Sequence, residues 1–189
     1  MHKNIDHVLV SAEQITDKAK ELGRQITEEY KERKEVPLLV ALLKGSVPFL
    51  SELAKHIELD IQIDFMDVSS YEGTESIGDI KINLDLHCSV KGVSILLVED
   101  IVDTGRTLKE VTRLLKNKGA KEVKVVSLLD KPDRRVVDIK ADYVGFTIPN
   151  EFVVGFGLDY NQKYRNLPYI GVLKKEIYKE FPEDNIISE

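Results

Sequence analysis

The sequence predicts an α/β fold with a doubly wound, mainly parallel sheet, flanking helices, a small antiparallel hairpin or hood, and a flexible loop. Continuous apolar runs, typical of strands buried on both faces, recur along the chain. Segments with helical apolar spacing separate several of these runs, which favours parallel strands joined by right-handed crossovers. Two further segments alternate apolar and polar residues, which predicts a pair of antiparallel strands.

The first part of the chain predicts a helix, a buried strand and a second helix. Ser11 and Gln14 form a capping box, and apolar residues then recur at helical spacing to about Arg33. The continuous apolar run at 37–43 predicts a buried strand. Residues 47–57 predict a helix, with Pro48 tolerated in its first turn.

Two alternating segments, 60–68 and 80–86, predict half-buried strands that pair antiparallel at one edge of the sheet or over the active face. The polar, glycine-containing segment 69–79 joins them. It is long for a hairpin turn, and loops of this kind are often functional lids.

The remaining elements continue the alternation of strands and helices. A buried strand is predicted at 93–98, and a helix marked by Leu108, Val111 and Leu115 ends at Gly119. Further strands are predicted at 123–129, 143–148 and 169–173, and the acidic tail after Phe181 is expected to fray. We expect a single domain over 1–189, with its core at about 11–175 and the hairpin with its mobile loop at about 60–88.

The composition narrows the function class. The 189 residues include 27 Lys and Arg against 33 Asp and Glu, and this net charge of −6 disfavours a general nucleic-acid binder. No apolar run approaches a membrane span, and the N-terminus lacks the apolar stretch of a signal peptide. The single cysteine, Cys88, is interpreted as a half-buried thiol of a reduced, cytoplasmic protein.

The most informative segment is 95–108, where a buried strand is expected to end in Glu99-Asp100. Asp103 and Thr104-Gly105-Arg106-Thr107 follow, and then a helix begins. A helix N-terminus with free N–H groups favours one phosphate, and neighbouring carboxylates accept hydrogen bonds from hydroxyls or hold a hydrated divalent cation. A ribose phosphate, which carries a phosphate and a vicinal diol, satisfies both halves.

Other interpretations of this segment are weaker. Each acid alone could be an ordinary helix-capping group, worth about 0.3–1 kcal/mol. The Gly-Lys-Ser/Thr loop of nucleoside triphosphatases is absent, and Gly155-Phe156-Gly157 lacks the third glycine of a dinucleotide site. Asp100 and Asp103 also lie one residue too far apart for an Asp-x-Asp phosphatase pair.

The segment resembles the phosphoribosyl pyrophosphate signature of type I phosphoribosyltransferases, and the rest of the chain resembles their hypoxanthine-guanine branch. The resemblance covers nearly the whole sequence. It rests on the signature and on several separate motifs: Leu43-Lys44-Gly45, Ser70-Tyr71, Leu128-Leu129-Asp130-Lys131, Phe152-Val153-Val154-Gly155, and Leu158-Asp159-Tyr160 with Arg165. It implies transfer of a phosphoribosyl group to a 6-oxopurine, with release of pyrophosphate.

The resemblance also assigns roles to individual residues. Glu99 and Asp100 match the acids that contact the ribose hydroxyls near Mg²⁺, and Asp103 matches the general base. Thr104, Gly105, Arg106 and Thr107 match the 5′-phosphate cradle, with a backbone contribution expected at Arg106. Lys44, Gly45 and Arg165 match pyrophosphate contacts, and the loop at Lys44-Gly45 often contains a cis peptide in this family. The cofactor implied is Mg²⁺, with Glu99, Asp100 and Asp159 as its protein ligands and no dedicated all-protein cage.

At the purine end, Lys131 matches the donor to the 6-oxo group, which would reject adenine. Phe152 matches the stacking aromatic, Val153 a backbone contact to the base, and Asp159 a residue near the purine two-position. Ser70 and Tyr71 match the lid. Without the family, Lys131 would be a solvated lysine, Phe152 a core side chain and Arg165 a surface arginine.

Two alternatives stay open. A regulator of this fold could sense phosphoribosyl pyrophosphate and bind nucleic acid, although the acidic balance disfavours it. Another phosphoribosyltransferase could prefer xanthine, adenine or a pyrimidine. The partners expected are a 6-oxopurine and phosphoribosyl pyrophosphate, with no nucleic acid and no membrane, in a homodimer or homotetramer.

Overall fold

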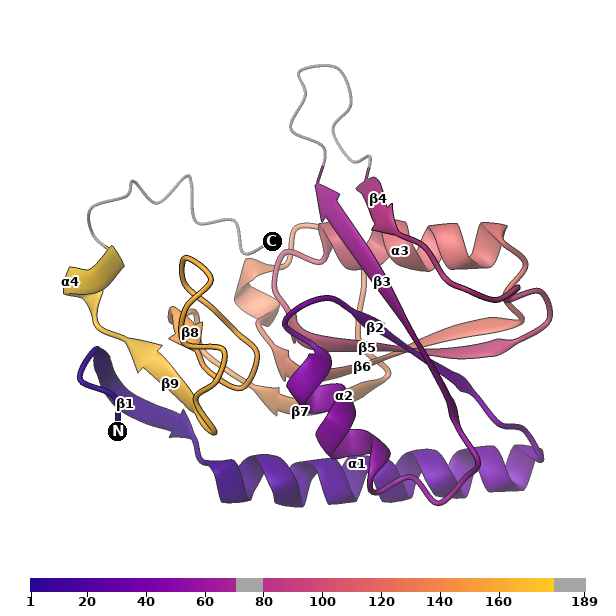
Figure 1. Cartoon of the computed structure of the whole chain (residues 1–189), viewed down its shortest axis with the longest axis horizontal. Coiled ribbons are helices and arrows are strands. Elements are labelled where there is room, and N and C mark those ends of the chain that lie inside the picture. Colours follow the sequence, from indigo (N-terminus) through magenta and orange to yellow (C-terminus); the bar gives the residue numbers. More distant parts are fainter. Residues whose placement is uncertain (71–79, 179–189) are drawn as a thin grey trace.

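The computed structural model describes residues 1–70 and 80–178, and its elements alternate between strand and helix as expected (Figure 1). In chain order they are β1 (Ile5–Val10), α1 (Ala12–Arg33), β2 (Leu38–Leu42), α2 (Val47–Ala54), β3 (Gln62–Ser70), β4 (Ile80–Leu84), β5 (Ser94–Val102), α3 (Arg106–Asn117), β6 (Glu122–Asp130), the 3-10 helix η1 (Pro132–Arg134), β7 (Tyr143–Thr147), β8 (Val153–Val154), β9 (Ile170–Leu173) and α4 (Lys175–Tyr178).

The central sheet has six strands in the order β4-β3-β2-β5-β6-β7, and every neighbouring pair is parallel except β3 and β4. Figure 1 shows α1 and α2 on one side of this sheet and α3 on the other. Two apolar core clusters fill the two sides, one containing Ile26 and Phe49 and the other containing Val111 and Leu115. The doubly wound, mainly parallel fold is therefore confirmed.

The sheet contains a point at which the strand order reverses. From β2 the chain moves outward to β3, and it later returns to place β5 on the opposite side of β2. In doubly wound sheets, ligands bind outside the carboxyl ends of the strands at such a point. We therefore expect the segments that follow β2 and β5 to form a ligand-binding site.

Local sequence signals set several element boundaries. The capping box of α1 forms as predicted, because Ser11 Oγ accepts from the Gln14 N–H at 3.1 Å and Gln14 Oε1 accepts from the Ser11 N–H at 2.8 Å. The strand predicted at 37–43 is β2, and all five of its residues are buried. Gly119 follows the end of α3 with a φ of +91°, a left-handed conformation that glycine adopts without strain.

The structure differs from the sequence prediction in five details. The segment at 169–173 does not join the parallel sheet: β9 pairs antiparallel with β1 and β8 in a separate three-stranded sheet, and β1 was not predicted at all. β4 is mostly exposed rather than half-buried, because it is the edge strand of its sheet. Cys88 is exposed. Strand β5 continues past Glu99 and Asp100 to Val102, because β6 pairs with it as far as Asp130.

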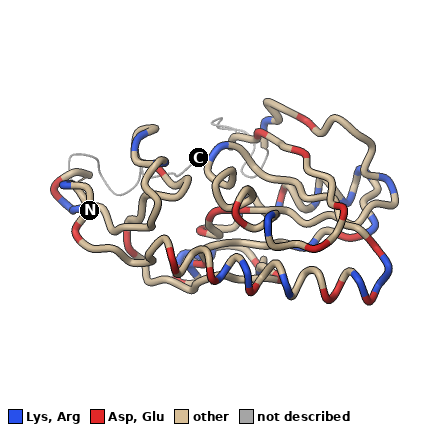
Figure 2. The backbone as a smooth tube through the Cα atoms, turned by 60° about the horizontal axis from the view of Figure 1, so that its bottom comes forward, with Lys and Arg blue, Asp and Glu red and all other residues tan. Residues whose placement is uncertain are grey.

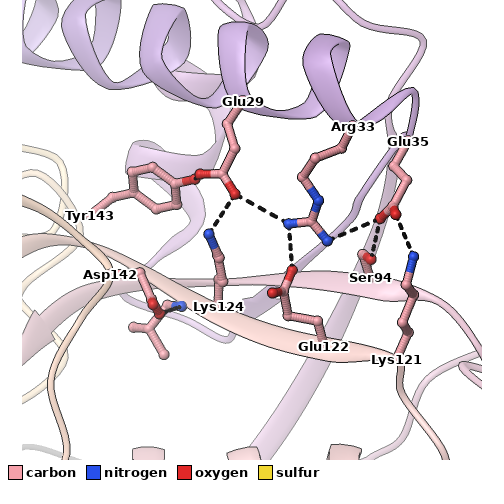
Figure 3. Close-up of polar contacts among 10 residues, drawn as sticks. Glu29, Arg33, Glu35, Ser94, Lys121, Glu122, Lys124, Asp142 and Tyr143 are labelled. Atoms are coloured by element: carbon pink, nitrogen blue, oxygen red, sulfur yellow. Dashed lines mark hydrogen bonds and ion pairs between the residues drawn. The ribbon is translucent and has the colours of Figure 1, made fainter.

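An ion-pair network holds α1 against the amino-terminal ends of β5 and β6 (Figure 3). Arg33 pairs with Glu122 at 2.7 Å and with Glu29 and Glu35 at 3.1 Å each. Glu29 also accepts from Lys124 and from the Tyr143 hydroxyl. These contacts lie at the amino-terminal ends of the parallel strands, opposite the carboxyl ends where ligands bind. We therefore assign them a role in stability.

Acidic and basic residues alternate along the chain, most clearly in α1 (Figure 2). Within residues 1–70 and 80–178, no helix combines the length and apolarity needed to cross a membrane. Tyr71 of the predicted lid and the tail after Phe181 lie outside the described residues. Ser70 is the last residue of β3 and is opposite Ile80 in the register with β4.

Candidate active site

Three segments meet at the reversal point of the sheet. A Cβ atom added at Gly45, after β2, would lie 1.7 Å from the Asp100 Oδ2 atom on β5. A Cβ atom added at Gly157 would lie 1.9 Å from the Gly45 carbonyl oxygen, and Gly157 has a φ of +103°. Gly45 and Gly157 are therefore required by close backbone approach. The structure thus joins the loop after β2, the acids of β5 and the turn after β8 into one site.

The loop after β2 has an unusual backbone. A cis peptide bond joins Leu43 to Lys44, one bond before the Lys44-Gly45 peptide. Ser46 is buried, and its hydroxyl donates to the Leu42 carbonyl at the start of α2. The loop therefore carries Lys44 and Gly45 directly beside Asp100.

The two acids of β5 lie in surroundings that disfavour their charged forms. Burial raises the pKa of Glu99 well above its usual range, and the neighbouring charge of Asp100 raises it further. Burial also raises the pKa of Asp100, to about 6; Arg165 partly offsets this rise and Asp159 adds to it. A hydroxyl donor or a cation would relieve this cost, because either one stabilises an ionised carboxylate.

Helix α3 begins at the segment predicted to bind phosphate. Gly105 is the N-cap of α3 with a φ of +80° and makes no side-chain cap bond, and Thr104 Oγ1 accepts from the Arg106 N–H at a long 3.5 Å. Thr104 and Thr107 are half-buried, whereas the Arg106 side chain is exposed. The first N–H groups of α3 and its positive dipole end are thus available to an anion.

Asp103 lies just before this helix N-terminus and is held by two arginines that sequence reasoning missed. Its carboxylate Oδ1 accepts from Arg134 Nε at 3.1 Å, and its carbonyl accepts from Arg135 Nε at 3.1 Å. In the sequence, Arg134 and Arg135 only follow the Lys131-Pro132 motif. Nothing local indicates which carboxylate or carbonyl they reach.

Lys131 is not a solvated lysine. Its side chain is only 7% exposed, and its Nζ donates to the Glu151 carbonyl at 2.6 Å. Burial lowers the pKa of Lys131, while the charge of Asp103 acts in the opposite direction. The Lys131 N–H also donates to the Val102 carbonyl at 3.0 Å, so the main chain at Lys131 is attached next to Asp103.

The aromatic and acidic side chains of 152–165 lie on the small sheet and its turn. Phe152 stacks on Tyr178 with a centroid distance of 5.0 Å and meets Tyr160 edge to face at 5.6 Å. Val153 is buried on β8. Phe152 and Val153 therefore lie where the small sheet adjoins the turn that carries Gly157.

Asp159 and Arg165 pair directly within this turn. The Asp159 Oδ1 atom lies 2.7 Å from Arg165 Nη2, and Asp159 Oδ2 accepts from the Gln162 N–H at 2.8 Å. Arg165 Nη1 donates to the Gly157 carbonyl at 2.7 Å, while Arg165 Nε is buried without a partner. Arg165 is therefore not an isolated surface arginine.

The carboxylates expected to bind metal are not gathered into a protein cage. Among the described residues, no group of three or more His, Cys, Asp or Glu could hold a metal ion. Asp159 already uses both oxygens within the turn, whereas Asp100 places Oδ2 against Gly45. Oxygen atoms from a substrate and from water would be needed to complete a site for Mg²⁺.

A doubly wound sheet with a glycine-capped helix N-terminus after its central strand and half-buried acids beside it is typical of phosphate-binding enzymes of the α/β class. The model of the phosphoribosyl transferase domain matches residues 10–161. The chain belongs to this family.

Similar proteins point to one branch of the family. The hypoxanthine-guanine phosphoribosyltransferase of Lactococcus lactis is 59% identical over 181 residues, which cover 95% of this chain and 97% of that protein. The crystal structure of a hypoxanthine phosphoribosyltransferase from Staphylococcus aureus has a TM-score of 0.88 and 51% identity, covering 94% of this chain and 96% of that one. The hypoxanthine phosphoribosyl transferase of Trypanosoma cruzi has a TM-score of 0.90 at 35% identity, covering 95% and 97%.

Proposed function

We propose that this protein is a purine salvage enzyme that converts hypoxanthine or guanine and phosphoribosyl pyrophosphate to IMP or GMP and pyrophosphate. Relatives at 59% and 55% identity are named hypoxanthine-guanine phosphoribosyltransferases, and a crystal structure at 51% identity is named a hypoxanthine phosphoribosyltransferase. The observation that carries the proposal is the contact of Gly45 with Asp100 and of Gly157 with Gly45 at the reversal point of the sheet, next to the N-terminus of α3.

The ribose phosphate is assigned to the loop after β5. The N–H groups at the start of α3 bind the 5′-phosphate, with Thr104 and Thr107 adding hydroxyl donors and with Gly105 and Arg106 contributing backbone. Glu99 and Asp100 accept hydrogen bonds from the ribose hydroxyls. These bonds replace part of the hydration that the two buried carboxyl groups have lost.

The pyrophosphate is assigned to Lys44, Gly45 and Arg165. Gly45 permits the backbone to approach closely, and Lys44 supplies positive charge. The buried, unpartnered Nε of Arg165 supports a role in which this guanidinium gains a further acceptor when substrate binds. The expected result is stabilisation of the charge that develops on the leaving group.

The purine is assigned to the site between Lys131 and Phe152. Lys131 donates to the 6-oxo group, Phe152 stacks on the ring, and Val153 and Asp159 contact the base near the two-position through backbone. Adenine presents an amino donor where hypoxanthine presents an acceptor. A buried lysine would therefore face a second donor, and adenine is rejected.

In the transfer step, a ring nitrogen of the purine forms the new bond to the anomeric carbon as the carbon–oxygen bond to pyrophosphate breaks. The bonding electron pair leaves with pyrophosphate. The proton on the attacking nitrogen passes to the carboxylate of Asp103, which acts as general base. Such a group typically contributes about 10²–10⁴ in rate.

We infer that Mg²⁺ assists this reaction. The Glu99 and Asp100 carboxyl groups fit a hydrated divalent cation, because they are hard oxygen ligands that burial leaves with an uncompensated cost of ionisation. Asp159 is the third predicted ligand. When bound, the ion neutralises charge on the phosphate oxygens.

A spectrophotometric assay of hypoxanthine, guanine, xanthine and adenine with magnesium tests the proposal. We expect turnover of the first two bases and little with adenine. The K131A variant should weaken purine binding and relax discrimination against adenine, whereas unchanged selectivity would remove its assignment. Absence of turnover with every base, together with tight salt-dependent binding of nucleic acid, would favour the regulator instead.

Other expectations remain predictions from the family resemblance. They are a homodimer or homotetramer, a cytoplasmic location, and a lid formed by Ser70 and Tyr71. Sedimentation equilibrium measures the first of these directly. A lid that excludes water should make truncation within 69–79 lower kcat more than it lowers stability.

A further inference from the structure

The segment that follows β6 wraps around the phosphate-binding loop. The Lys131 N–H donates to the Val102 carbonyl at 3.0 Å, and the Val136 N–H donates to the Thr104 carbonyl at 3.1 Å. A Cβ atom added at Gly105 would lie 2.6 Å from a methyl group of Ile139. We call residues 131–139 the strap. It contacts the phosphate-binding loop at both ends of that loop.

Arg135 joins the strap to the loop's main chain. Its three guanidinium nitrogens donate to the carbonyls of Asp103, Val102 and Ile139 at 2.9–3.1 Å, and it also pairs with Asp130 at the end of β6. Its side chain is largely buried, at 15% exposed. These contacts leave the backbone of Asp103 little freedom, because buried charge-assisted hydrogen bonds are costly to break.

Arg134 contacts the side chain of the same residue. Its Nε donates to Asp103 Oδ1 at 3.1 Å, with side-chain exposures of 39% for Arg134 and 20% for Asp103. No donor from the described part of the chain reaches Asp103 Oδ2. The arginine therefore engages one carboxylate oxygen and leaves the other for a ligand.

An ordinary surface ion pair does not explain this arrangement. Such a pair would contribute at most about 1 kcal/mol to stability. Here two successive arginines hold the carbonyl and the carboxylate of one acid, and Lys131, from the same strap, donates its N–H to the carbonyl of the preceding residue, Val102. Both partners of the purine are thereby placed by a single segment.

We propose that Arg134 is a positioning residue for the transfer reaction: it orients the Asp103 carboxylate so that Oδ2 faces the ring N–H of the incoming purine. Arg135 supports it by fixing the main chain. This inference rests on the proposed role of Asp103 as general base. The opposite arrangement, in which Arg134 blocks Asp103 and must leave before catalysis, predicts that removing Arg134 accelerates the reaction.

The test compares kcat and KM of wild type, R134Q, R134K, D103N and the D103N/R134Q double variant, with R113Q as control. Arg113 is on α3, is 64% exposed, and pairs with Glu110 through its Nε rather than with the loop. R134Q should lower kcat by about 10–100-fold, the effect of misplacing a reacting group by about 1 Å, with little change in the KM for phosphoribosyl pyrophosphate. R134K should recover part of the loss, and R113Q should match wild type. Melting temperatures exclude unfolding as the cause.

The double variant separates positioning from a general effect. If Arg134 acts only through Asp103, R134Q should cost less than about twofold when added to D103N. An equal loss in both backgrounds, or a normal or faster R134Q enzyme, would overturn the inference while leaving a slow D103N enzyme, and hence the base assignment, intact. A D103N enzyme with a near-normal rate would overturn both.

Discussion

Replacing Asp100 by asparagine should stabilise the folded protein at neutral pH while impairing substrate binding. The Asp100 carboxyl group loses much of its hydration on folding, and its pKa rises to about 6. Asparagine has the same shape and can still accept the Ile101 N–H bond that Oδ1 accepts at 2.7 Å. The variant therefore removes the cost of a buried charge without opening a cavity.

The magnitude follows from the two pKa values. The ordinary pKa of the group is 3.8 and its folded pKa is about 6. Since one unit of pKa is equivalent to ~1.4 kcal/mol, ionised Asp100 costs about 3 kcal/mol at neutral pH. For a protein of this length, about 3 kcal/mol corresponds to a rise of roughly 6–12 °C in the melting temperature of D100N.

The raised pKa of Asp100 also determines how the stability of the protein changes with pH. A folded pKa above the unfolded value means that Asp100 contributes most to stability below pH 3.8, where it is protonated in both states. This contribution is lost as the pH rises through about 6. The melting-temperature difference between D100N and wild type should therefore be large near neutrality and shrink steadily as the pH falls from about 6 toward 4.

Calorimetric or fluorescence melting across this range checks the prediction, with D138N as the control because Asp138 is exposed. D138N should change the melting temperature little at any pH. A D100N protein that is less stable than wild type at neutral pH, or a difference that does not depend on pH, would refute the reasoning. The same variant should bind phosphoribosyl pyrophosphate more weakly, as expected where a functional site is held at the expense of stability.

Three further variants test the packing of the site and the network in Figure 3. G45A places a methyl group 1.7 Å from the Asp100 carboxylate, so we expect a large loss of turnover and a destabilisation of about 1–3 kcal/mol; wild-type kinetics would contradict the close approach. G157A adds a Cβ 1.9 Å from the Gly45 carbonyl at a φ of +103°, and should raise the KM for phosphoribosyl pyrophosphate and lower the melting temperature together. R33Q removes the partner of three carboxylates and should lower the free energy of unfolding in urea by about 1–3 kcal/mol, with a normal kcat. The control R24Q breaks one exposed ion pair of 3.8 Å and should leave the stability nearly unchanged.

Much of the fold was accessible to sequence reasoning because its signals are local. The capping box at Ser11, the fully buried run of β2 and the glycine after α3 each depend on a few neighbouring residues. The run at Ile170–Leu173 has the same apolar character as a parallel central strand, yet it pairs antiparallel with β1. Apolar character reports burial and does not report which partner strand provides it.

In the candidate site, too, some features follow from local sequence and others depend on contacts between distant segments. The cradle at Gly105 follows one strand and opens one helix, so its local pattern was sufficient. Arg134 and Arg135 acquire their roles only because the strap returns to the loop after β5. Gly157 was considered as part of an incomplete dinucleotide motif, whereas its close neighbour in the structure is Gly45, far away in the sequence.

The order of apolar and polar residues along this chain was enough to establish an α/β architecture and to predict the turn at which α3 begins, because periodicity and helix-end chemistry act over a few residues. Only the folded molecule decided that Asp100 is confined by Gly45, that Lys131 is buried with its Nζ on the Glu151 carbonyl, and that two arginines hold Asp103. Burial and carboxylate pKa values depend on segments brought together from distant parts of the chain. No local pattern contains that information.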